Sequence, residues 1–184
     1  DVYKRQRLSP EQMLYIIEHA GDRLLFVDTT FVPIIEKLIP KLPKNLVIIV
    51  MASSDDSSTL SDNFLNYEQL ILESSHDIIW PEFPENTAAG LCYTSGTTGN
   101  PKGALYTHRS TVLHALTTSL NLGPSLGDGM KVLPVVPLFH VNAWGLPYAA
   151  PLTGTSLIFP GPNLDGASLF DCLLYTSPSP RDRG

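Results

Sequence analysis

Apolar residues near the start of the chain recur at the spacing of an α-helix. The apolar positions of this stretch are Met13, Ile16, Ile17 and Ala20. Ser9 precedes them as a cap, and Gln12 stands where a capping box requires it. Pro10 suits a first helical turn and Gly21 suits a helix end. The pattern therefore predicts a helix over residues 10–20.

Short apolar runs alternate with helical patterns along the rest of the chain. Strands are predicted at residues 24–27, 46–51, 88–93 and 132–136, and helices at residues 31–39, 66–73 and 108–120. Thr107 is the predicted cap of the last helix, whose packing face is predicted to hold Val112, Ala115, Leu116 and Ser119. Residues 52–61 are predicted to form a loop rich in Ser and Asp, and residues 80–86 an extended connector. Strands that alternate with helices indicate an α/β fold with a parallel crossover.

Composition and charge narrow the class of protein. The chain has 184 residues, 43% of them hydrophobic, and a net charge of −6. An acidic chain without a basic run is a poor partner for nucleic acid. The longest apolar stretch, residues 46–52, is too short to span a bilayer. Cys92 and Cys172 have no metal or redox spacing, and His108 and His114 are not spaced as a metal pair on a helix.

The two ends of the chain differ from its middle. Residues 1–6 are polar and unpatterned, and residues 172–184 lose all periodicity. Both resemble translated adapter sequence, so we expect residues 1–6 and 172–184 to be foreign and residues 7–171 to carry the fold. An ordinary disordered tail is the alternative for the second segment.

The apolar run at residues 88–93 ends abruptly in hydroxyl groups and glycines. Residues 94–102, called the phosphate loop below, contain Thr94, Ser95, Gly96, Thr97, Thr98, Gly99 and Lys102. Glycines let backbone N–H groups approach an anion, hydroxyl groups add donors and can bind Mg²⁺, and a lysine adds a positive charge. Neither the Walker pattern nor the Gly-x-Gly-x-x-Gly pattern is present. The alternative is a surface loop of small polar residues, which does not require a lysine and a glycine at fixed offsets.

Residues 93–103 resemble the phosphate-binding signature of the adenylate-forming, or AMP-binding, superfamily. This superfamily includes acyl-CoA synthetases, luciferases and the adenylation domains of peptide synthetases. The resemblance implies that residues 7–171 are the first part of its large N-terminal domain, which contains sheets flanked by helices and a distorted β-barrel.

A second group of residues follows the strand predicted at residues 132–136. Residues 137–145 place His140, Asn142 and Trp144 among apolar neighbours, and on a helix His140 and Trp144 would share a face. The end of a strand in an α/β sheet is where ligand contacts lie. The alternative is that Phe139 and Trp144 are core and that His140 is a hydrogen-bonded core histidine. The segment is similar to a second motif of the acyl-CoA synthetases, in the form that the medium- and long-chain fatty-acid branch of these enzymes carries.

The resemblance implies a role for each residue in these motifs. Thr94 would bind Mg²⁺, the stretch Ser95, Gly96, Thr97, Thr98 and Gly99 would hold the departing pyrophosphate, and Lys102 would neutralise phosphate charge. His140 would border the acyl and CoA channels, Val141 and Trp144 would touch the nucleotide, and Trp144 would also gate a fatty-acid tunnel. The implied reaction activates a fatty acid with ATP and Mg²⁺ and then transfers the acyl group to CoA.

Other motifs of the superfamily are absent from these residues. They include a glutamate that binds the metal, the ribose site and the catalytic lysine of a mobile C-terminal domain. We therefore expect the chain alone to be inactive and the full-length protein to be a ligase. Its expected compartment is the cytoplasm or an organelle matrix. Peripheral contact with a membrane and a homodimer are both compatible with this prediction. The alternatives are a truncated nucleotide-binding or structural protein without turnover, or a ligase for an aryl or short-chain acid.

Overall fold

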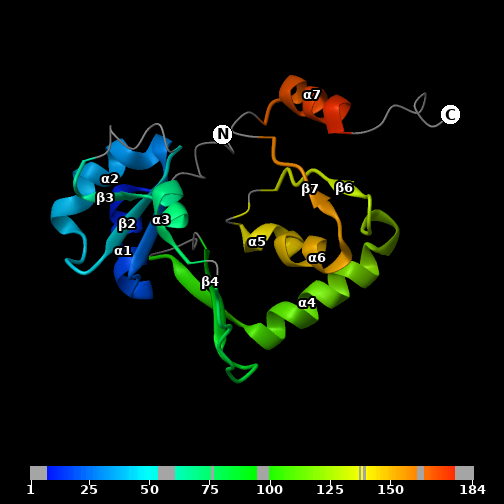
Figure 1. The fold of residues 1–184 in the computed structure, drawn as a ribbon, viewed down its shortest axis with the longest axis horizontal. Helices are drawn as coiled ribbons and strands as arrows, with labels where there is room; N and C mark the ends of the chain where they lie inside the picture. Colours follow the sequence, from blue (N-terminus) through cyan, green and yellow to red (C-terminus); the bar gives the residue numbers. More distant parts are fainter. Residues whose placement is uncertain are drawn as a thin grey trace. The chain divides into compact units, whose positions relative to one another are not determined.

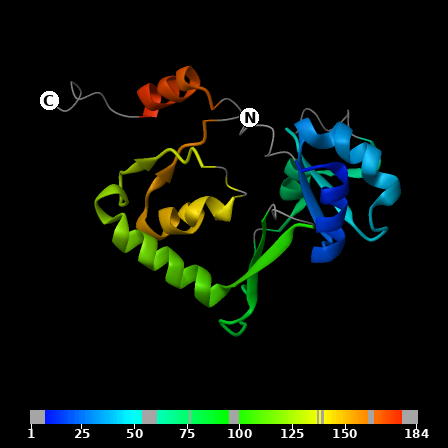
Figure 2. The same cartoon turned by 180° about the vertical axis from the view of Figure 1, so that it is seen from behind.

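The computed structural model describes residues 8–53, 61–75, 77–94, 100–136, 138, 140–160 and 164–176. The chain divides into two compact units (Figures 1 and 2). The first unit comprises residues 1–82 and 95–102, and the second comprises residues 83–94 and 103–184.

The first unit begins with helix α1, Pro10–Ala20. Its capping box is formed, since the Ser9 hydroxyl accepts from the Gln12 N–H at 3.2 Å and the Ser9 N–H donates to the Gln12 side chain at 3.1 Å. Gly21 ends the helix in the left-handed region, at φ 67°. The helix predicted at residues 10–20 is therefore confirmed.

A parallel sheet of three strands forms the centre of this unit (Figure 1). Its strands are β1 (Leu24–Asp28), β2 (Val47–Met51) and β3 (Phe64–Asn66). Leu24 pairs with Val47, and Ile48 pairs with Phe64. The buried core lies on this sheet and on helix α2, and consists of Val27, Ile35, Leu38, Ile48, Val50, Ala52 and Phe64.

Two helices complete the first unit. Helix α2 (Val32–Leu38) follows a 3-10 turn, η2 (Thr29–Phe31), and leads into another, η3 (Ile39–Lys41). Helix α3 (Tyr67–Glu73) is capped by the side chain of Asn66. Both helices and the strands β1 and β2 agree with the predictions. Strand β3 was not predicted because it has only three residues. The loop predicted at residues 52–61 lies mostly outside the described residues.

The second unit contains two short sheets and four helices, all named from the described residues. Strands β4 (Ala88–Thr94) and β5 (Lys102–Thr107) form one sheet, and only the first residue of β5, Lys102, is counted with the first unit. Strand β6 (Lys131–Val132) pairs in parallel with β7 (Ser156–Leu157). The helices are α4 (His108–Asn121), α5 (Val141–Trp144), α6 (Leu146–Thr153) and α7 (Gly166–Thr176), with a 3-10 turn η5 (Gly123–Ser125) after α4.

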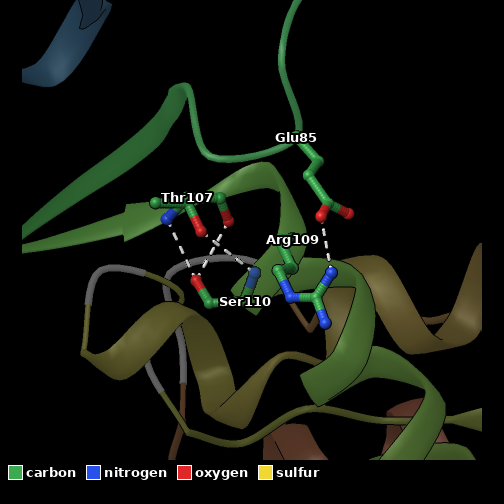
Figure 3. Close-up of polar contacts among 4 residues, drawn as sticks. All are labelled: Glu85, Thr107, Arg109 and Ser110. Atoms are coloured by element: carbon green, nitrogen blue, oxygen red, sulfur yellow. Dashed lines mark hydrogen bonds and ion pairs between the residues drawn. The ribbon is translucent and has the colours of Figure 1, made fainter.

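Hydrogen bonds and an ion pair hold the start of helix α4 (Figure 3). The Thr107 hydroxyl accepts from the Ser110 N–H at 3.1 Å, and the Ser110 hydroxyl accepts from the Thr107 N–H at 3.0 Å. The Arg109 guanidinium forms an ion pair with the Glu85 carboxylate at 2.5 Å, and the Arg109 backbone N–H donates to the Glu85 backbone carbonyl at 2.8 Å. The predicted cap and helix are confirmed, and the connector at residues 80–86 forms neither helix nor strand.

The predicted packing face of α4 is only partly correct. Ala115 is buried, but Val112 and Leu116 are 56% and 45% exposed. Helix α4 packs against α6, whose buried residues Ala149 and Ala150 are small. A narrow contact of this kind covers a small residue and leaves its larger neighbours outside.

The strand predicted at residues 132–136 is shorter than expected. Strand β6 ends at Val132, and Pro134 follows two residues later. Proline has no N–H group to donate, so the ladder does not continue past it. The α/β class is confirmed, although the described strands form three separate sheets and no closed barrel.

The end of helix α7 bears on the prediction for the C-terminal segment. Helix α7 continues through Cys172 to Thr176, into the segment predicted to be foreign. The origin of both terminal segments stays a prediction.

No helix among the described residues combines the length and the apolar character needed to cross a membrane.

Candidate functional site

Two strands hold the ends of the phosphate loop. Thr94 is the last residue of β4, and Lys102 is the first residue of β5. The residues between them that were predicted to bind phosphate are Ser95, Gly96, Thr97, Thr98 and Gly99, and they lie outside the described residues. Lys102 was predicted to lie in a loop. Because it begins a strand, the sheet fixes its backbone.

Gly103 allows β5 to run close to β4. A Cβ atom at this position would lie 2.9 Å from Leu91 Cδ1 and 3.4 Å from the Tyr93 ring. Both side chains belong to β4, so a larger residue at position 103 would push against the strand that ends in Thr94. The glycine next to Lys102 therefore has a packing role that is independent of any ligand.

The second motif does not form the right-handed helix on which His140 and Trp144 would share a face. Four consecutive residues adopt left-handed backbone angles: Val141 (φ 52°), Asn142 (φ 48°), Ala143 (φ 45°) and Trp144 (φ 56°). His140, before them, is extended at φ −95° and ψ 108°. We call residues Val141–Trp144 the left-handed turn. The four-residue spacing argument for His140 and Trp144 is therefore wrong, because His140 is extended and lies outside the turn that contains Trp144.

Such a turn is costly for residues that carry a side chain. The left-handed region costs about 1–2 kcal/mol for each such residue, because Cβ crowds the following carbonyl oxygen. Strain of this kind persists where surrounding contacts hold it and is frequent at binding sites. The turn is thus a place where this unit stores free energy.

Contacts from β4 and α4 hold the left-handed turn. The Cys92 thiol of β4 donates to the Asn142 side-chain oxygen at 3.0 Å. His114 Nε2 of α4 lies 3.2 Å from the Trp144 carbonyl oxygen. Within the turn, the Ala143 N–H donates to the His140 carbonyl at 3.0 Å. Cys92 is half-buried, and the Asn142 side chain is its hydrogen-bond partner.

A cavity of about 370 Å³ lies beside the turn, within the second unit. Its walls come from β5, α4, the turn and the start of α6, and the lining residues are Tyr106, Ser110, Thr111, His114, Val141, Asn142, Gly145 and Tyr148. Cavities of a few hundred cubic ångströms with apolar walls and a few polar groups are typical of small-molecule sites. This one offers hydroxyl, imidazole and amide groups.

The structure brings only some of the predicted residues to this cavity. Val141 lines it, whereas His140 is exposed and the Trp144 side chain is 65% exposed. The exposure of Trp144 argues against the alternative that it is a core residue of this unit.

Sequence reasoning missed the contribution of α4 to the cavity. Ser110, Thr111 and His114 all line it, at the offsets of three and four that place residues on one helical face. That spacing was available in the sequence. His114 had been considered only as one half of a metal pair.

A divalent cation would find few protein ligands among the described residues. They contain no cluster of three His, Cys, Asp or Glu side chains. Mg²⁺ is commonly held by one or two protein oxygens together with substrate phosphates and water. The Thr94 hydroxyl is an oxygen donor of the right kind, so it fits a phosphate-bound Mg²⁺.

Known proteins are similar to this chain over most of its length. The chain is 50% identical over 164 residues to a medium-chain-fatty-acid–CoA ligase of Ectopseudomonas oleovorans, which covers 89% of this chain and 30% of that protein. It is 46% identical over 166 residues to a 3-methylmercaptopropionyl-CoA ligase of Ruegeria pomeroyi, with 89% and 30% covered. The chain thus spans about a third of the length of these relatives.

A solved structure shares the fold. The crystal structure of the anthranilate CoA ligase AuaEII in complex with anthranoyl-AMP matches with a TM-score of 0.73 and 24% identity, over 90% of this chain and 31% of that chain. The sequence profile described as AMP-binding enzyme matches residues 2–177. The resemblance inferred from the two motifs is confirmed: the chain belongs to the AMP-binding enzyme family.

Proposed function

We propose that the product of the complete reading frame containing these residues, called the full-length protein below, is a fatty-acid–CoA ligase that uses ATP. The observation that carries the proposal is the family match over residues 2–177, which includes both motifs. The 50% identity to a medium-chain-fatty-acid–CoA ligase supports a fatty acid as the substrate.

In the first step a carboxylate oxygen of the acid attacks the α-phosphorus of ATP. The new O–P bond forms as the bond to the β-phosphate oxygen breaks, which gives acyl-adenylate and pyrophosphate. Carboxylate and triphosphate repel each other, so the site must supply positive charge and alignment. We assign the charge to Lys102 and the pyrophosphate contacts to Ser95, Gly96, Thr97, Thr98 and Gly99.

The Thr94 hydroxyl is the residue of this chain that we assign to Mg²⁺. The cation would neutralise phosphate charge as the pyrophosphate leaves. Because Thr94 ends β4, the strand fixes the backbone from which its side chain extends.

In the second step the CoA thiol loses its proton to solvent, and its sulfur attacks the acyl carbonyl carbon. The thioester C–S bond forms, and AMP leaves with the electrons of the cleaved C–O bond. The substrate carboxylate is the nucleophile of the first step and the CoA sulfur that of the second, so the mechanism needs no nucleophilic side chain. We assign His140 to the acyl and CoA channels, Val141 and Trp144 to contacts with the nucleotide, and Trp144 also to the gate of the fatty-acid tunnel.

A second candidate substrate is a short acid that contains sulfur. The 46% identity to a 3-methylmercaptopropionyl-CoA ligase favours it, and this relative differs little in identity from the fatty-acid enzyme. An aryl acid remains the third option. The proposed compartment is the cytoplasm or an organelle matrix, and a homodimer stays a prediction.

The test is acyl-CoA formation by the purified full-length protein with ATP and CoA. The panel contains saturated acids from butyrate to palmitate, 3-methylmercaptopropionate and benzoate. We expect the highest kcat/KM with a medium- or long-chain acid. A maximum at 3-methylmercaptopropionate would support the second candidate. Tight ATP binding without turnover of any acid would overturn the proposal in favour of a nucleotide-binding protein.

A further inference from the structure

We propose that His114 is a positioning residue, which holds the left-handed turn and thereby sets the direction of the Trp144 side chain. None of the sequence motifs includes this histidine. Its role follows from the contacts that it makes with the residues at the end of the turn.

The first contact is a hydrogen bond to the backbone of Trp144. His114 Nε2 lies 3.2 Å from the Trp144 carbonyl oxygen. A carbonyl oxygen only accepts, so the proton must be on Nε2. The bond acts on the residue whose side chain is in question, at the end of four strained residues.

The second contact is steric. Gly145 follows the turn at φ 77°, and a Cβ on it would lie 2.5 Å from His114 Cδ2 and 2.7 Å from Nε2. The imidazole thus occupies the space beside Gly145 that a side chain would need. The ring and the glycine fit each other, and together they fix where the turn ends.

Cys92, which also holds the left-handed turn, bonds to a different residue of it. Cys92 donates to the side chain of Asn142, two residues before Trp144, and a thiol is a weak donor. It steadies the start of the turn and leaves the peptide of Trp144 to His114.

The same imidazole also faces the cavity. His114 lines its wall together with Val141 and Asn142 of the turn. A molecule in the cavity would therefore touch the side chain that holds Trp144. That consequence for substrate entry rests on the proposed function, whereas the structural role of His114 does not.

The test uses the full-length protein labelled with 5-fluorotryptophan and observed by ¹⁹F NMR. The Trp144 and Trp80 signals are assigned by Trp144→Phe and Trp80→Phe. We expect His114→Leu, which keeps bulk without a donor, to shift or split the Trp144 signal and leave Trp80 unchanged. His114→Gln, which restores an N–H donor, should return the signal to its wild-type position.

The matched control is Thr117→Ala. This exposed residue lies one turn further along α4, and its hydroxyl donates to the Leu113 carbonyl of the same helix. It should leave both signals in place. An unchanged Trp144 signal in His114→Leu would overturn the proposal. Should that variant not fold, His114→Ala takes its place: a displaced Trp144 signal supports the role, and an unchanged one contradicts it.

Thermal unfolding gives an independent test of the steric contact. Gly145→Ala should lower the melting temperature more in the wild-type background than in His114→Ala, because the smaller residue frees the space that the new methyl group needs. Equal losses in the two backgrounds would show that the ring and the glycine do not interact. None of these measurements needs ligase activity, so their failure is distinct from failure of the proposed function.

Discussion

Thr94 and Lys102 end and begin paired strands, and this gives the phosphate loop fixed ends. Thr94 closes β4 and Lys102 opens β5, with Gly103 packed against Leu91 of β4. A group that stabilises charge in a transition state acts best when its position is set beforehand. The proposed chemistry therefore depends on these two side chains and on Trp144.

We predict that Lys102→Ala and Thr94→Ala each reduce fatty-acid-dependent ATP–pyrophosphate exchange by the full-length protein. Losing one charge-stabilising group of this kind costs on the order of 10²-fold in rate. Lys131→Ala is the matched control, since Lys131 is an exposed lysine in β6, outside both motifs. Exchange within about twofold of wild type in both variants would remove the assigned roles.

Trp144→Ala should change binding more than stability. The side chain is 65% exposed in this structure, and surface substitutions usually change the unfolding free energy by less than about 0.5 kcal/mol. A buried aromatic residue would cost about 3–5 kcal/mol. We expect the full-length variant to keep its melting temperature and to lose the dependence of fatty-acid binding on ATP.

The control for this variant is Trp80→Ala. Trp80 is 81% exposed and lies outside both motifs, so its loss should leave the coupling between ATP and fatty acid intact. A large fall in melting temperature for Trp144→Ala, with coupling unchanged, would mean that Trp144 is a core residue of the full-length protein.

At the scale of elements, caps and turns determine where helices start. Thr107 and Ser110 bond each other at the start of α4, which carries three of the residues that line the cavity. Asp28 has the same function at the end of β1, where its carboxylate accepts from the Thr30 hydroxyl at 2.7 Å and the Thr30 N–H at 2.9 Å.

Thr107→Ala should destabilise the protein by about 1 kcal/mol, the usual cost of losing a side-chain cap. Thr117→Ala, in the interior of the same helix, should cost less, because Thr117 caps nothing. Urea unfolding of both variants measures the difference. Equal midpoints would contradict the capping role.

Acid should weaken the turn after β1. The hydrogen bonds from the Thr30 side chain and then its backbone lower the pKa of Asp28 below the usual aspartate value. A lowered pKa means that the stabilisation is present above the unfolded-state value, near 3.9, and is lost as the pH falls through the folded-state value. Asp28→Asn should therefore flatten the pH dependence of unfolding below about pH 4. A profile identical to that of wild type would contradict this.

The sequence predicted most elements because local signals agree with the fold. The Ser9 and Gln12 capping box, the Thr107 cap and the apolar runs of β1, β2 and β4 are all local. The left-handed turn could not be predicted, since it is held by Cys92 and His114, distant in sequence. The same limit applies to the cavity, whose walls come from separate elements.

At the scale of the whole molecule, the chain is about 30% of the length of its relatives. The superfamily motifs for the ribose, the metal-binding glutamate and the catalytic lysine are absent from it. We therefore expect the 184-residue chain, purified alone, to form no acyl-CoA from ATP, fatty acid and CoA. Saturable turnover that depends on the acid would show that these residues suffice for the reaction.

In the proposed reaction the acid's carboxylate attacks the α-phosphate of ATP. The most direct measurement follows ¹⁸O from the labelled carboxyl group of a fatty acid during turnover by the full-length protein, with the products analysed by mass spectrometry. We expect one ¹⁸O atom in AMP for each acyl-CoA formed, since the C–O bond breaks in the second step. Label in inorganic phosphate, with ADP as the nucleotide product, would show attack at the γ-phosphate and contradict the account.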